Sequence, residues 1–95
     1  MQDLWSLLRE RDFVDEERKS IRSRIRVTKA RIRLKESRNY SGKMYDLLNL
    51  GQALAYEQMT LVNFAHRLGE LDRKIAEITS EMEKSANRQK GADNE

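Results

Sequence analysis

The chain has no cysteine and no proline, and only four glycines, one histidine and one tryptophan occur among its 95 residues. Without cysteine it has no disulfide, no thiol nucleophile and no cysteine-ligated zinc site. The lack of proline and the few glycines argue against a β-sandwich, whose short strands need frequent turn residues. No apolar run approaches the roughly 20 residues that cross a bilayer, so we expect no membrane association.

The N-terminal segment MQDLWSLLRERD carries an acid early and has no long apolar core, which makes it a poor signal or transit peptide. We therefore predict a cytoplasmic protein, with a nuclear location left open if the source is eukaryotic. The initial Met and the aperiodic C-terminal segment favour a complete chain.

Charge is divided unevenly along the chain, although the formal net charge is only +3. Residues 18–43 hold eleven Lys or Arg and one acid, Glu36, a balance of +10. The other residues hold eight basic and fifteen acidic side chains, a balance of −7. The chain is therefore an electrical dipole, and the basic stretch needs a source of negative charge to neutralise it.

A heptad of apolar residues runs through the second half of the chain. Its a and d positions are Leu47, Leu50, Leu54, Glu57, Leu61, Phe64, Leu68, Leu71, Ile75, Ile78, Met82 and Ser85. Ten of these twelve are apolar, which predicts a long helix of the coiled-coil type. A neighbouring stripe of small and medium residues widens the apolar face: Leu48, Gly51, Ala55, Val62, Ala65, Gly69 and Ala76.

The first half has a weaker heptad, interrupted by two arginines. Its a and d positions are Leu4, Leu7, Arg11, Val14, Arg18, Ile21, Ile25, Thr28 and Ile32. The stretch SIRSRIRVTKARIRLKES, residues 20–37, also alternates with the period of a strand. A helix is favoured because no hairpin turn lies within it and a strand of this length would have no partner.

The predicted fold class is all-α, an antiparallel two-helix hairpin that dimerises into a four-helix bundle. The hairpin spans residues 1–85, with helices at 3–36 and 44–85, a loop at 37–43 and a disordered tail at 86–95. Asp3 is the expected N-cap of the first helix, and Asn39 and Gly42 are the candidates for turn conformations. The segment Asn49–Gly51 is a candidate break in the second helix.

Three sets of residues are candidates for binding. The basic patch contains Arg22, Arg24, Arg26, Lys29, Arg31, Arg33, Lys35, Arg38 and Lys43. The seam of the core and dimer contains Leu47, Leu54, Leu61, Phe64, Leu68, Leu71, Ile75 and Ile78. An apolar anchor, or alternatively bundle-end core, is expected from Trp5, Leu8 and Phe13.

Enzymatic chemistry has little support in the residue inventory. His66 lies on the outer side of its heptad, and the segment Ser41–Lys43 lacks the upstream glycine of a phosphate-binding loop. We expect no enzyme, no metal, no cofactor and no small-molecule substrate. The expected function is an adaptor, chaperone or regulator that self-associates as an antiparallel homodimer and binds a protein. The alternative is nonspecific binding of DNA or RNA through residues 18–43.

Overall fold

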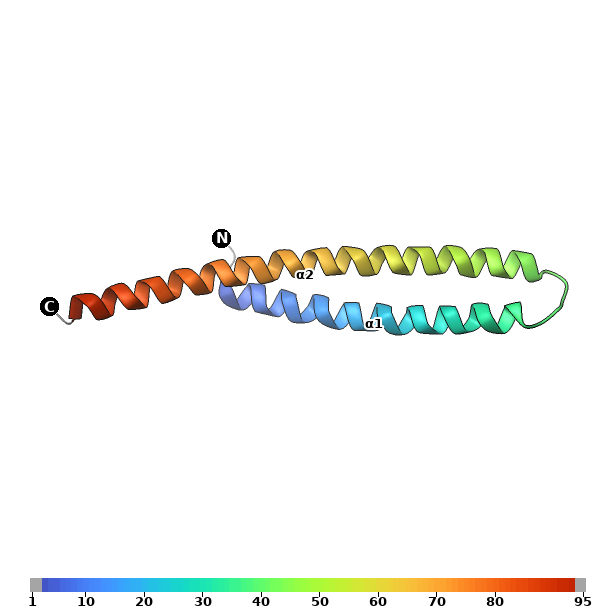
Figure 1. Cartoon of the computed structure of the whole chain (residues 1–95), viewed down its shortest axis with the longest axis horizontal. Helices are drawn as coiled ribbons and strands as arrows, with labels where there is room; N and C mark the ends of the chain where they lie inside the picture. Colours follow the sequence, from blue (N-terminus) through green and yellow to red (C-terminus); the bar gives the residue numbers. More distant parts are fainter. Residues whose placement is uncertain (1–2, 94–95) are drawn as a thin grey trace.

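The computed structural model describes residues 3–93 as two antiparallel helices joined by a short loop (Figure 1). Helix α1 runs over Leu4–Glu36 and helix α2 over Lys43–Asp93. The rod they form measures 83 × 21 × 14 Å. The prediction of an all-α hairpin is confirmed, and residues 20–36 are helical rather than extended.

Helix α1 begins and ends with ordinary capping interactions. The side chain of Asp3 accepts a hydrogen bond from the backbone N–H of Ser6 at 2.7 Å, which confirms Asp3 as the N-cap. At the other end, the N–H of Ser37 bonds back to the carbonyl of Arg33 at 3.1 Å. Arg33 and Lys35 lie in the last turn, where the helix dipole favours cations.

The loop uses Gly42 to start α2. Gly42 has φ of 86°, and no other residue in the described range has a positive φ. Its carbonyl accepts the N–H of Asp46 at 3.0 Å, the first bond of the new helix. The expectation that Gly42 adopts a turn conformation is confirmed, whereas Asn39 does not take a left-handed one.

The core between the helices is narrow, and it follows the two predicted seams. Buried apolar side chains in the described residues are Leu7, Val14, Ile21, Ile25, Leu68 and Leu71. Four of them form one cluster, Leu7, Val14, Leu68 and Leu71, against which Phe64, Ile75 and Ile78 pack. This cluster lies at the end of the hairpin far from the loop. The remaining predicted seam residues, Leu47, Leu54 and Leu61, are half-buried nearer the loop.

Helix α2 is longer than α1 and extends beyond it as a single helix (Figure 1). The predicted end at residue 85 differs from the structure, because residues 86–93 continue the helix. Ala86 and Arg88 are good helix formers and no proline interrupts the segment. Local helix propensity therefore extends α2 beyond the part that packs against α1. Residues 94–95 of the expected tail lie outside the described residues.

The predicted break at Asn49–Gly51 is wrong, since α2 runs through it without interruption. Nothing lies within 4 Å of a Cβ placed on Gly51 or on Gly69. Neither glycine therefore serves a close approach of α1, and both are exposed on α2.

Gly51→Ala should stabilise the hairpin by about 0.5–1 kcal/mol, because alanine restricts the unfolded chain and meets open space in the folded one. Gly42→Ala is the matched control and should destabilise it, because Gly42 has φ of 86°. Thermal unfolding followed by circular dichroism measures both. A loss of stability in Gly51→Ala would contradict the open surface at this position.

Candidate functional site

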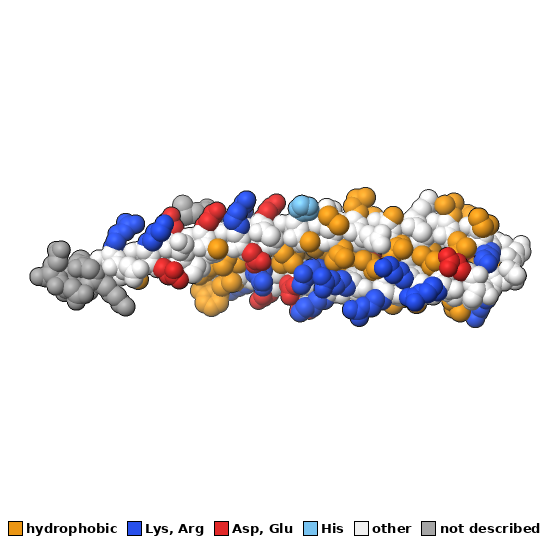
Figure 2. All heavy atoms as spheres, viewed as in Figure 1, with side chains coloured by type: hydrophobic (Ala, Val, Ile, Leu, Met, Phe, Trp, Pro, Cys, Tyr) orange, Lys and Arg blue, Asp and Glu red, His pale blue; other side chains and the backbone are white. Residues whose placement is uncertain are grey.

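Seven of the nine residues of the basic patch lie in the half of α1 that leads into the loop, where blue side chains gather in Figure 2; Arg38 lies in the loop and Lys43 at the start of α2. Arg22, Arg26, Lys29 and Arg33 follow one another at helical spacing along one flank of α1. Arg24 and Arg31 lie on the opposite flank and line a groove between the helices. All six are exposed.

The loop end of the patch is held by Asp46 of α2. Lys35 Nζ lies 3.3 Å from the Asp46 carboxylate, and the Tyr40 hydroxyl donates to it at 2.9 Å. The hydrogen bonds from Tyr40 and Lys35 lower the pKa of Asp46. The ammonium of Lys35 also lies 5.2 Å from the Tyr40 ring centroid, in cation–π range. Tyr40 is thus a packing residue of the loop.

The rest of the patch has no acidic partner in the part of the hairpin that the structure describes. Lys43 Nζ donates to the carbonyl of Glu36 at 2.9 Å. No ion pair or hydrogen bond among the described residues engages the other seven cations, Arg22, Arg24, Arg26, Lys29, Arg31, Arg33 and Arg38. The hairpin therefore leaves a block of unneutralised arginines beside its loop.

The opposite end of the hairpin pairs several of its charges across the two helices. Arg11 Nε lies 2.5 Å from Asp72 across the two helices. Arg67 pairs with Glu10 of α1 and, at 3.1 Å, with Glu70 on its own helix. The hydrogen bond and charge of Asp72 raise the pKa of Arg11, and those of Glu10 and Glu70 raise the pKa of Arg67.

These ion pairs also explain Arg11 and Arg18, which interrupt the predicted seam of α1. Arg18 bonds to Asp15 one turn earlier at 2.7 Å, and Lys19 lies 3.5 Å from the same carboxylate, as its i,i+4 spacing predicts. The Arg18 Nε is buried and has no partner among the described residues. Sequence reasoning missed the cross-helix pairs, although Asp72 stands opposite Arg11 in any antiparallel hairpin of this length.

A second polar pair crosses the seam nearer the loop. The hydroxyl of Thr28, a buried side chain, donates to Glu57 Oε1 at 2.6 Å. The other carboxylate oxygen, Glu57 Oε2, is buried without a hydrogen-bond partner in the described structure. An unsatisfied buried carboxylate oxygen costs free energy, so this pair is a weak point of the seam.

The anchor residues point away from the core. Trp5 is 73% exposed and Phe13 is 65% exposed, whereas Leu8 is half-buried. Trp5 and Phe13 are therefore not part of the core of the single hairpin, and their burial at the end of a bundle stays a prediction.

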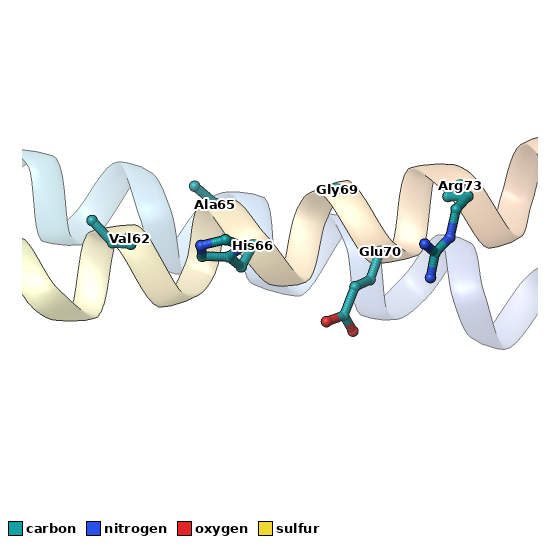
Figure 3. A pocket seen from close by; sticks show the side chains of 6 residues that line it. All are labelled: Val62, Ala65, His66, Gly69, Glu70 and Arg73. Atoms are coloured by element: carbon teal, nitrogen blue, oxygen red, sulfur yellow. The ribbon is translucent and has the colours of Figure 1, made fainter.

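The small-residue stripe of α2 is also exposed rather than packed on α1. Leu48 and Val62 are 60% and 55% exposed, and Ala55, Ala65, Gly69 and Ala76 lie beside them. Figure 3 shows the hollow that Ala65 and Gly69 leave on the outer side of α2, with α1 behind it. Its lining includes Val62, His66, Glu70 and Arg73, and its volume is about 480 Å³.

A larger groove of about 540 Å³ runs between the helices on the basic half. Small residues leave room on both of its sides, with Ser20 and Ser23 on α1 and Ala53 on α2. Arg24, Arg31 and Tyr56 border it. It is an open surface groove rather than an enclosed pocket.

No protein-family model, curated protein or solved structure matches this chain. Its own surfaces therefore carry the functional interpretation. Among the described residues, no group of three or more His, Asp or Glu side chains is placed to hold a metal ion. Neither helix, over its described length, has the length and apolarity that crossing a membrane requires.

Proposed function

We propose that the chain is a non-enzymatic helical-hairpin module that self-associates and binds another protein as an adaptor, chaperone or regulator. The observation that carries this proposal is the mismatch between a narrow core and a broad exposed apolar surface. Among the described residues, the fully buried large side chains are Leu7 and Leu71, whereas Trp5, Phe13, Met44, Tyr45, Leu48, Tyr56, Met59 and Val62 are each more than half exposed. Exposed apolar stripes along helices mark contact surfaces.

An antiparallel homodimer that forms a four-helix bundle is the arrangement we favour. It covers apolar surface that a single hairpin leaves wet, and it brings the basic half of one hairpin beside the acidic half of the other. The second copy is thereby the first partner of the basic patch, and a protein target binds the apolar surface that the dimer leaves exposed.

Light scattering on a size-exclusion column, with absorbance at 260 and 280 nm, tests the proposal. One chain has a mass of 11.2 kDa, so a dimer should elute at about 22 kDa. A mass of one chain at every concentration would exclude the dimer and, with it, the four-helix bundle.

Nonspecific binding of DNA or RNA is the second candidate, and the seven unpaired cations of α1 and the loop are the observation in its favour. Arginine pairs with phosphate in a bidentate manner, and release of counterions makes such binding fall steeply with salt. If the arginines bind nucleic acid, replacing Arg24, Arg31 and Arg33 with Gln should abolish the retardation of a labelled duplex while the helices stay folded. If they serve dimerisation, the same variant should change the oligomer mass instead.

A further inference from the structure

The outward face of α1 carries a second heptad that the hairpin does not use. Phe13, Ser20, Val27 and Leu34 recur every seven residues, and Glu16, Ser23 and Ala30 occupy the positions between them. Phe13 is 65% exposed, and Val27 and Leu34 are each 50% exposed. A repeat of this period on one face of a helix is the pattern of a coiled-coil contact with another helix.

The charges that border this outward face change sign along the helix. In its first half the borders hold Asp12 and Glu17, and in its second half they hold Arg24, Arg26, Arg31 and Arg33. None of these six side chains has an ion pair within the described part of the chain. Both the acids and the arginines are therefore available to a partner.

We infer that the outward face of α1 binds the same face of a second copy, with the two α1 helices antiparallel. This inference rests on the proposed self-association and names the surface and register that make it. Ser20 of one copy lies opposite Ser23 of the other, Phe13 lies opposite Ala30, and Val27 lies opposite Glu16. In that register Glu17 meets Arg24, and Asp12 meets Arg33, each pair occurring twice by the twofold symmetry.

The shape of the surface fits the centre of this register. Ser20, Ser23 and Val27, near the middle of the stripe, also line the groove of about 540 Å³ between α1 and α2. Each small residue faces a side chain of the second copy, so that Phe13 packs over Ala30 and the backbones approach closely. Tyr56 of α2 borders the same groove and adds apolar surface to the contact.

Charge selects the second copy over other occupants of this face. A parallel pair of α1 helices would place Asp12 beside Glu17 and Arg26 beside Arg31, so that like charges meet. A phosphate backbone that covered the whole stripe would be repelled by Asp12 and Glu17. The antiparallel register also brings Lys19 opposite Arg26, but the acids Asp15 and Glu16, at 3.5 and 3.4 Å, already offset the charge of Lys19.

A charge-swap cycle at Glu17 and Arg24 tests the register, with the dimer dissociation constant measured by sedimentation equilibrium. Glu17→Arg alone and Arg24→Glu alone should each raise it about tenfold, because each places like charges together at two symmetric sites. The double variant Glu17→Arg/Arg24→Glu should return to within about threefold of the original value. Arg22→Glu changes the net charge as Arg24→Glu does, but on the other flank of α1, and should leave dimerisation nearly unchanged.

The outcomes separate this inference from the proposed function. A dimer that is weakened equally by Arg22→Glu and Arg24→Glu, or that the double variant does not restore, would overturn the register and leave self-association standing. A chain that is monomeric at all concentrations would overturn both. Circular dichroism checks that the single variants stay helical, as exposed positions outside the core should.

Discussion

Leu71→Ala should destabilise the hairpin by about 3–5 kcal/mol, measured by urea unfolding followed at 222 nm. Leu71 is completely buried and belongs to the cluster that packs the N-terminal part of α1 against α2. Truncation of Leu71 removes apolar contacts and leaves a cavity. Two stiff helices cannot move together enough to fill that cavity. A protein of this size has a total stability of roughly 5–15 kcal/mol, so the loss is a large part of it.

Val62→Ala is the matched control for Leu71→Ala. It removes apolar side-chain atoms from the same helix, but Val62 is 55% exposed and does not face α1. The control should change stability by less than about 0.5 kcal/mol. Similar losses from both variants would show that the cluster around Leu71 is not the main support of the hairpin.

Replacing the polar pair Thr28–Glu57 by Thr28→Val/Glu57→Leu should stabilise the hairpin by about 1–3 kcal/mol. The Glu57 Oε2 atom is buried without a hydrogen bond, and the apolar pair removes that desolvation cost while it extends the seam. Guanidinium unfolding measures the change.

Glu77→Leu serves as the control for the seam replacement, since it removes an exposed acid from the same helix. It should shift stability by only a few tenths of a kcal/mol. Destabilisation by the Thr28→Val/Glu57→Leu double variant would show that the carboxylate of Glu57 has a partner outside the single hairpin.

The seams and caps of the hairpin could be predicted because each depends on local spacing. Leu7, Val14, Ile21 and Ile25 all fall on the heptad positions of the first half, and all are buried. Asp3 and Gly42 were identifiable because an N-cap and a left-handed residue each need particular residue types.

The C-terminal end of α2 could not be predicted from heptad spacing or capping residues. A helix that extends past its partner is held by propensity alone, and the polar segment 86–93 gives no periodic signal of it. The predicted break at Gly51 was wrong because packing outweighs a low local propensity. Glycine weakens a helix by only about 1 kcal/mol, and the packing of a long helix overrides that.

Which charges of the basic patch stay unpaired depends on the packing of both helices. Sequence reasoning identified the basic patch and found too few acids opposite it, but the structure shows which cations remain unpaired. Among the described cations of the patch, Lys35 pairs with Asp46, whereas Arg11 and Arg18, outside the patch, pair with Asp72 and Asp15. Sequence reasoning missed the outward stripe of α1, from Phe13 to Leu34. Its apolar residues are fewer than the isoleucines, which follow both the strand-like alternation and the inner heptad. The alternating arginines border the buried seam on one side of the helix and the exposed stripe on the other.

Distances between spin labels in the assembled protein test the antiparallel dimer most directly, because the chain has no cysteine and each label site is unique. In the proposed register, labels on Ser37→Cys should lie about 46 Å apart along the helix axis, whereas labels on Ser20→Cys should lie about 5 Å apart along it. Short distances at both sites would mean that the two copies are parallel, and no intermolecular distance at either site would contradict the dimer itself.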